Sequence, residues 1–210
     1  MKLKYYAHAC FSLSYKNGTV LVTDPYDETV TYPPCNASCD AALVSHDHFD
    51  HNHIQSLEGH FETVRTAGTF DIGGVRITAT ESFHDKEQGA LRGKNLIFRI
   101  EGENLCIGHL GDLGHMPCGH QKEAMADLDV LLIPIGGNFT IDTQEAEAII
   151  RELKPHVAIA MHYRTDEYDV PIATCKEFEK DMNAVRMPRE IEITSENIHD
   201  LPPVIIMAHK

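Results

Sequence analysis

Short apolar runs separated by polar turns dominate the first half of the chain. Alternating or wholly apolar patterns predict strands at residues 2–6, 10–15, 20–23, 41–44, 75–79, 95–100, 105–107 and 130–133. Asn17-Gly18 lies between two of these runs and is a strong signal for a β-hairpin. A loop rich in proline, aspartate and cysteine occupies residues 24–40. The short strand that follows this loop leads directly into Ser45 and His46.

The later part of the chain adds helical periodicity. Asp142 and Glu145 are spaced as a capping box, and apolar residues follow at i, i+3, i+4 and i+7, namely Ala146, Ile149, Ile150 and Leu153. A proline ends this helix, and residues 156–161 read as a strand leading to His162. Pro171 is expected to open another helix with one apolar face, formed by Cys175, Phe178, Met182 and Val185. Strands and helices interleave, so the fold class is α/β or α+β.

Length and composition are those of a globular protein. The chain has 210 residues, of which 42% are hydrophobic and 24% charged, enough to bury a sizeable core. No stretch approaches the roughly 20 apolar residues of a membrane-spanning helix, and His8 interrupts the apolar start before a secretory signal could form. Six scattered cysteines without framework spacing read as reduced thiols. We therefore expect a cytoplasmic protein without a membrane partner.

The charge balance narrows the choice of partners. A net charge of −14 argues against a nucleic-acid binder, because such proteins neutralise phosphates with lysine and arginine. It does not exclude a small anionic substrate, since bound metal ions can be the largest positive charges in a site. Residues 202–207 are apolar and read either as an edge strand or as a contact to another subunit, which leaves a homo-oligomer open.

Histidine stands out, with 14 residues, and the densest group is a short string after the predicted strand 41–44. This H-x-H-x-D-H string consists of His46, His48, Asp50 and His51. Imidazole and carboxylate groups suit zinc, which binds N and O donors at about 2.0–2.2 Å. Four donors exceed what one catalytic ion takes, because one position must stay open for water. The surplus indicates two ions.

The string and its surroundings resemble the metallo-β-lactamase superfamily signature. Asp24 resembles the first motif of that superfamily, a buried aspartate that braces the ligand loop. His84 resembles the third motif, Asp112 the bridging carboxylate of the fourth, and His162 the last ligand. The resemblance extends over most of the chain in order and spacing.

The resemblance implies a site with two metal ions. The first ion would be held by His46, His48 and His84, and the second by Asp50, His51 and His162, with Asp112 spanning both. The ions would be zinc, with manganese as the alternative. Asp50 and Asp112 would serve in catalysis, and a metal-activated water would attack an ester, lactone or phosphoester of a small molecule.

The resemblance also implies the fold. We expect an α+β protein with the αββα four-layer sandwich of the superfamily, in which two mixed sheets lie face to face with helices outside. The chain would form one domain, 1–210, with pseudo-halves of about 1–104 and 105–210. A more local similarity is to the branch that includes the L-ascorbate 6-phosphate lactonase-like hydrolases, carried by stretches such as Ala7-His8-Ala9, 134–140 and Met161-His162-Tyr163.

Three further residues are candidates for supporting roles. Motif order favours His84 over His109 as the ligand, which leaves His109 as a group behind the ligands or facing the substrate. His8 either lines the pocket or is a surface histidine. Asn138 follows a strand on a glycine-containing loop, where it either contacts substrate or caps the next helix.

Other functions on the same fold remain as alternatives. An RNA-processing nuclease is weakened by the acidic charge. In a di-iron redox protein of the flavodiiron kind, the corresponding string resembles H-x-E-x-D-H. It has glutamate where this chain has His48, and this difference argues against the redox function. A non-catalytic metal-binding module would be expected to lack at least one ligand, and this chain has them all.

Overall fold

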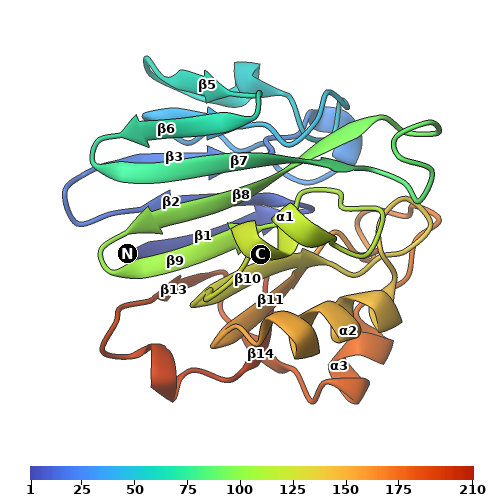
Figure 1. Cartoon of the computed structure of the whole chain (residues 1–210). Helices are drawn as coiled ribbons and strands as arrows, with labels where there is room; N and C mark the ends of the chain where they lie inside the picture. The colour runs from blue at the N-terminus through green and yellow to red at the C-terminus, as the bar shows by residue number, and fades with distance from the viewer.

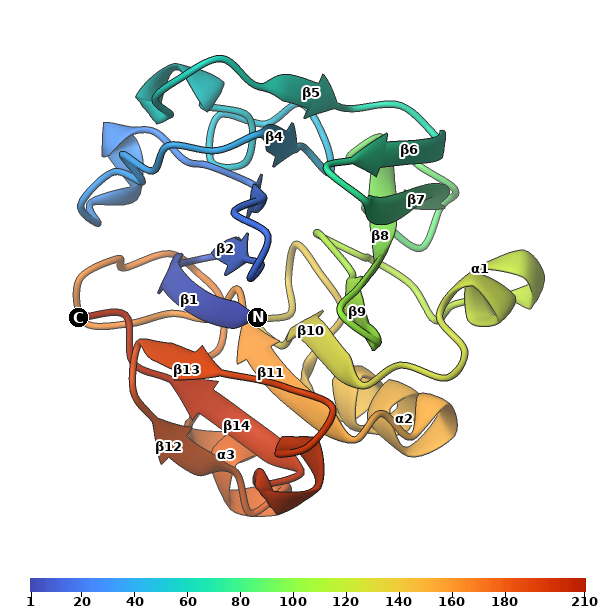
Figure 2. The ribbon, with the colours of Figure 1, turned by 90° about the vertical axis from the view of Figure 1, so that its left-hand side faces the viewer.

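The computed structural model describes all residues, 1–210, and contains two β-sheets that lie face to face (Figures 1 and 2). The six-stranded sheet contains, in chain order, β1 (Lys2–Ala7), β2 (Cys10–Ser14), β3 (Val20–Thr23), β4 (Ala41–Leu43), β5 (Glu62–Val64) and β13 (Glu190–Glu192). The eight-stranded sheet contains β6 (Gly68–Ile72), β7 (Val75–Phe83), β8 (Lys94–Gly102), β9 (Leu105–His109), β10 (Val130–Pro134), β11 (Val157–Met161), β12 (Val185–Met187) and β14 (Val204–Met207).

Both sheets are mixed. The spatial order in the first is β13-β1-β2-β3-β4-β5, in which β1, β2 and β3 pair antiparallel and β3, β4 and β5 pair parallel. The order in the second is β12-β14-β11-β10-β9-β8-β7-β6, antiparallel from β6 to β9 and parallel from β9 to β12. As a result, β1, β4, β7, β9, β10 and β11 all end at the same edge of the sandwich.

The main hydrophobic core lies between the sheets, because each strand turns alternate side chains inward. Leu3 and Tyr5 of β1 pack there with Phe98 and Ile100 of β8. The other face of the eight-stranded sheet is covered by α1 (Gly119–Ala124), α2 (Thr143–Leu153) and α3 (Lys176–Asp181), as Figure 2 shows. None of these helices has the length and apolar character that crossing a membrane requires.

The outer face of the six-stranded sheet carries no α-helix. Residues 24–40 cover it instead, with the short 3₁₀ turn η1 (Glu28–Val30) inside them, and Tyr26, Val30 and Cys35 pack against the sheet. Two further 3₁₀ turns are η2 (Ile54–Ser56) and η3 (Ile198–Asp200). The predicted α+β sandwich with two mixed sheets is confirmed, and its outer layer on this side is a packed loop.

Helix α2 begins as predicted. The Asp142 side chain accepts a hydrogen bond from the Glu145 amide at 2.9 Å, and the Glu145 side chain accepts one from the Asp142 amide at 3.2 Å. The expected helix from Pro171 is wrong in its bounds: α3 starts at Lys176, and Val185 belongs to strand β12. Asn183 adopts a left-handed conformation with φ of 49°, which stops the helix before Val185.

The C-terminal apolar segment is a strand inside the sheet. Strand β14 pairs with β11 on one side and β12 on the other, both parallel. The expectation of an edge strand at residues 202–207 is wrong, because β14 has a partner strand on each side. The short strand β12 at the sheet edge was not expected, because its three residues are too few to show a pattern.

Candidate metal centre

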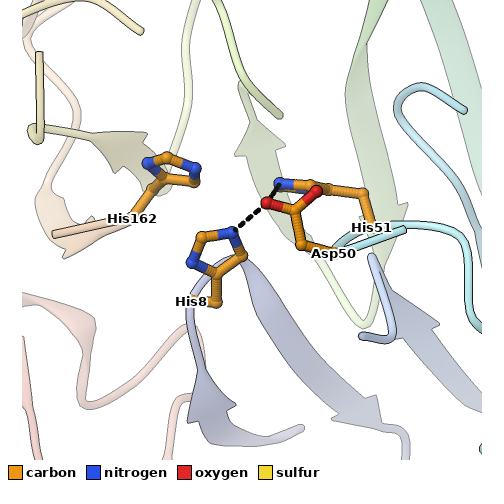
Figure 3. Close-up of side chains that lie close together, drawn as sticks. All are labelled: His8, Asp50, His51 and His162. Carbon is orange, nitrogen blue, oxygen red and sulfur yellow. Dashed lines mark hydrogen bonds and ion pairs between the residues drawn. The ribbon is translucent and has the colours of Figure 1, made fainter. Parts of the chain in front are cut away.

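Seven histidine and aspartate side chains converge at the shared edge where the strands end, and each follows a strand closely. They are His46, His48, Asp50 and His51 after β4, His84 after β7, Asp112 after β9 and His162 after β11. Their donor atoms form three overlapping groups within 4.8 Å: His46, His48 and His84; His46, His51 and Asp112; and His8, Asp50, His51 and His162. The structure therefore brings all seven predicted ligands together and adds His8. Figure 3 shows the third group, in which His8 faces Asp50, His51 and His162.

Asp112 lies at the centre of this cluster. Its Oδ2 lies 3.3 Å from His84 Nε2, 3.2 Å from His162 Nε2 and 3.9 Å from His46 Nε2. Its Oδ1 lies 3.4 Å from His51 Nε2. The carboxylate thus faces histidines from both predicted sets, as a bridging group would.

The cluster contains most of the unpaired buried polar atoms of the protein. Six buried side-chain nitrogen or oxygen atoms have no hydrogen-bond partner, and five of them belong to the cluster: His46 Nε2, His51 Nε2, His84 Nδ1, His162 Nδ1 and Asp112 Oδ1. Such atoms cost about 1–3 kcal/mol each when left unpaired. Coordination of cations by the nitrogen lone pairs and carboxylate oxygens would compensate this cost at the cluster, so the residues present fit a metal centre.

Asp24 fixes the orientation of two of these imidazoles. It is fully buried, and its Oδ1 accepts a hydrogen bond from the Ser45 amide at 2.7 Å. Its Oδ2 accepts from Ser45 Oγ at 2.7 Å and from His51 Nδ1 at 3.0 Å. Ser45 Oγ in turn lies 2.9 Å from His46 Nδ1. Protons on both Nδ1 atoms leave the Nε2 lone pairs of His46 and His51 directed into the cluster.

The electrostatics of the cluster also indicate a need for positive charge. Burial opposes the charged form of His51, but Asp112 and Asp50 beside it raise its pKa well above the usual value. Burial would raise the pKa of the Asp112 carboxyl, yet His162 and His51 lower it well below its usual range. Two ionised carboxylates thus favour a second proton on His51, at the Nε2 atom where a bound cation would take its place.

His8 is a pocket residue and not a surface histidine. It lies in the tight turn between β1 and β2, is only 4% exposed, and has a left-handed φ of 58°. Its Nε2 lies 3.1 Å from Asp50 Oδ2, and its ring centroid lies 4.1 Å from that of His162 (Figure 3). Burial first, and then the nearby His162, lowers the pKa of His8 to about 4. The neutral imidazole can therefore donate one hydrogen bond to Asp50.

The other two supporting candidates point away from the cluster. His109 is fully buried between the sheets, with Nε2 3.0 Å from the Ala9 carbonyl oxygen and Nδ1 accepting from the Gly111 amide at 3.0 Å. Both ring nitrogens are engaged, so His109 holds the loop after β9. Asn138 is exposed and donates to the Pro171 carbonyl oxygen at 3.1 Å, so it joins two loops.

Sequence reasoning missed two residues that support the site. Asn95 is fully buried and accepts a hydrogen bond from the Asp112 amide at 2.9 Å, while its own amide group donates to Ser82 Oγ and the Leu110 carbonyl. A lone amide at the start of an apolar strand was the available signal. Gly114 lies against β7, where an added Cβ would come within 2.3 Å of the backbone of His84 and Asp85. Only glycine permits this contact.

Comparison with known proteins agrees with this geometry. A family model described as the beta-lactamase superfamily domain matches residues 2–162, which span every residue of the cluster. The chain belongs to the metallo-β-lactamase superfamily. A UPF0173 metal-dependent hydrolase from Thermoplasma acidophilum is 30% identical to this superfamily member over 192 residues, covering 79% of this chain and 84% of the relative.

Two solved structures show the same fold. A candidate Zn-dependent hydrolase of the metallo-β-lactamase superfamily from Thermotoga maritima is 33% identical, with a TM-score of 0.83 over 98% of this chain and 97% of that one. An isothiocyanate hydrolase from Delia radicum gut bacteria, 15% identical with a TM-score of 0.69 over 100% of this chain and 97% of that one, shares the fold alone. The protein is thus a metal-dependent hydrolase of this superfamily with a histidine and aspartate cluster suited to metal.

Proposed function

We propose that the protein is a dinuclear zinc hydrolase that cleaves an ester, lactone or phosphoester bond of a small molecule. The first ion would be held by His46, His48 and His84, the second by Asp50, His51 and His162, with Asp112 between them. The observation that carries this proposal is the set of unpaired buried donor atoms around Asp112. Nitrogen and carboxylate donors without a thiolate suit zinc, and manganese is the alternative.

Two bound ions would supply a water of lowered pKa and a Lewis acid for the developing oxyanion. The chain's own groups prepare the site for that chemistry. Asp24 and Ser45 hold His46 and His51 in the tautomer that presents Nε2. His8 orients Asp50 from 3.1 Å, and the carboxylate stays ionised because, against the effect of burial, His51 and His8 lower its pKa. Asp50 can therefore accept a hydrogen bond from the attacking water.

The cavity over the cluster has the size for a small substrate. Its volume is about 370 Å³, within the range of small-molecule sites. Among the residues that line it, Arg92 is the one lysine or arginine. A single cation neutralises little of the phosphate charge of a polynucleotide backbone. Together with the net charge of −14, this favours a small-molecule hydrolase over an RNA-processing nuclease.

Metal analysis tests the site. Protein purified without added metal should contain close to two zinc or manganese ions per chain. Asp112→Ala should reduce this number and abolish hydrolysis, whereas His60→Ala, at an exposed histidine outside the cluster, should change neither. One ion per chain in the intact protein would disprove the dinuclear assignment, and stoichiometric iron would favour the redox alternative.

Turnover tests the reaction class. The probes are 4-nitrophenyl butyrate, γ-butyrolactone and bis(4-nitrophenyl) phosphate, for the ester, lactone and phosphodiester. The local similarity to lactonase-like hydrolases makes the lactone a required member of this set. Hydrolysis of at least one probe should depend on His46 and Asp112. Activity that survives replacement of both residues by alanine would show that the assigned site is wrong.

A further inference from the structure

Arg92 places an unpaired positive charge in the cavity over the metal cluster. It is the one lysine or arginine of the cavity lining, which also includes His84, His162 and Asp112. Its guanidinium makes no ion pair and no hydrogen bond within the protein, and its carbon lies 5.1 Å from the ring centroid of Phe139. A flat guanidinium resting on an aromatic ring keeps its N–H edges free for a ligand.

The backbone around Arg92 is firmly held. The Arg92 amide donates to Asp85 Oδ2 at 2.7 Å, and Asp85 also accepts hydrogen bonds from three other amides of the same loop. The His84 amide donates to the Gly93 carbonyl oxygen at 3.1 Å, which closes the base of the loop. The loop that carries Arg92 is thereby tied to His84, so this cation has a defined place relative to the metal cluster.

The rest of the cavity wall is mainly apolar. Phe49, Phe139, Val170 and Ile172 line it, and Phe49 remains 55% exposed although it directly precedes Asp50. Side chains of this kind at a cavity mouth favour an apolar ligand group. With two divalent ions bound, the positive charge in the cavity would exceed the negative charge of its two carboxylates, Asp50 and Asp112. The cavity then suits an anion in spite of the acidic chain.

We propose that Arg92 is the binding residue for an oxyanion of the substrate, a carboxylate or phosphate separate from the bond that is cleaved. The substrate class is a small acid with an apolar body and an ester, lactone or phosphoester link. This inference rests on the proposed function, because it places the cleaved bond at the metal cluster. Arginine suits the role, since its planar fork binds carboxylate and phosphate through two parallel hydrogen bonds.

A matched pair of esters tests the inference by turnover. 4-Nitrophenyl hydrogen glutarate carries a free carboxylate at the far end of its acyl chain, and 4-nitrophenyl butyrate lacks it. The zinc-loaded protein should prefer the glutarate ester in kcat/KM, mainly through a lower KM. Arg92→Gln should reduce that preference about 10- to 100-fold, the loss expected for one or two hydrogen bonds between charged groups.

The control is Lys94→Gln, which removes the same charge from the same segment. Lys94 lies outside the cavity lining and pairs with Glu81 at 2.8 Å, so this change should leave the preference intact. Arg92→Lys should restore only part of it, because an ammonium group lacks the fork geometry. No preference in the native protein, or equal loss in the glutamine variants of Arg92 and Lys94, would overturn the inference.

A binding measurement separates this inference from the proposed function. Glutarate, 4-phosphonobutyrate and butyrate are titrated into the zinc-loaded protein by calorimetry, with metal content as the check on folding. Arg92→Gln should weaken the binding of glutarate, 4-phosphonobutyrate or both by 10-fold or more, and the binding of butyrate by less than 3-fold. The dianion whose binding is weakened more identifies the anion that Arg92 binds as carboxylate or phosphate. Failure of all ester, lactone and phosphodiester turnover with this result intact would contradict the hydrolytic assignment alone. Equal weakening of all three ligands would contradict the role of Arg92.

Discussion

Asp85 offers the sharpest test of how the loop beside the metal cluster is stabilised. Its side chain is 4% exposed and accepts four backbone hydrogen bonds, two on each oxygen. The distances are 2.8 Å from the Glu87 and Gly89 amides to Oδ1, and 3.0 and 2.7 Å from the Leu91 and Arg92 amides to Oδ2. Asp85→Asn replaces one oxygen by an NH₂ group that cannot accept from the two amides facing it.

The magnitude follows from the bonds lost. A hydrogen bond to a charged group contributes about 1.5–3 kcal/mol, so losing two should cost about 3 kcal/mol or more of unfolding free energy. Asp71→Asn is the matched control, because Asp71 is exposed and accepts only one backbone hydrogen bond, from the Gly74 amide at 3.1 Å. That change should cost less than about 1 kcal/mol.

Urea unfolding of the metal-free protein, followed by circular dichroism because the chain has no tryptophan, measures both variants. Amide exchange should also become faster at Leu91 and Arg92 in Asp85→Asn. If Asp85→Asn costs no more than Asp71→Asn, the four hydrogen bonds do not stabilise the loop and the reasoning is refuted.

The same residue predicts a pH dependence. Burial raises the pKa of Asp85, but the hydrogen bonds from the Arg92 and Gly89 amides and their neighbours lower it to about 2. The unfolded value is about 3.9, so the stabilisation is fully present above that pH and is lost as the pH falls towards 2. The stability difference between the native protein and Asp85→Asn should therefore be constant from pH 7 to 5 and smaller at pH 3. A difference that does not change with pH would contradict the charge-assisted bonding.

Three further substitutions test the residues that support the proposed ligands. Asp24→Asn removes the charged partner of His51 Nδ1 and should weaken zinc binding about 10- to 100-fold, measured by competition with a chelator; unchanged affinity would show that Asp24 does not orient the ligand. Gly114→Ala brings a Cβ within 2.3 Å of the His84 carbonyl carbon and should lower both the melting temperature and the metal content; normal values of both would mean that the backbone relaxes freely. His109→Gln should retain the full metal content yet lose about 2–3 kcal/mol of stability by urea unfolding, because both ring nitrogens are engaged elsewhere; loss of metal would make His109 a ligand after all.

The strands that precede the proposed ligands were readable from the sequence because their patterns are local. Strand β4 and helix α2 were predicted from apolar runs and a capping box, and both are present. Helix α3 was misplaced, since Val185 continues a helical spacing that Asn183 interrupts in the structure. Backbone conformation at one residue overrides periodicity, and spacing alone does not reveal it.

The buried supports of the site needed the tertiary structure. Asn95 meets Asp112 only because β8 and β9 pair antiparallel, and Arg92 enters the cavity only because Asp85 folds its loop back towards His84. Neither residue belongs to a motif. Their roles depend on contacts between segments whose separation in the sequence carries no signal.

The sequence by itself determined the chemistry of the cluster: His46, His48, Asp50 and His51 in one string carry atoms that can bind a metal ion, and each further candidate follows a predicted strand. Only the tertiary structure decided which way each side chain points. His84 directly follows β7 and His109 ends β9 in the same sheet, yet His84 faces Asp112 whereas His109 faces the Ala9 carbonyl beside the opposite sheet. The physical reason is that residue type fixes which atoms can bind a cation, whereas the direction of a ring nitrogen is set by the partner that its other nitrogen meets across the fold.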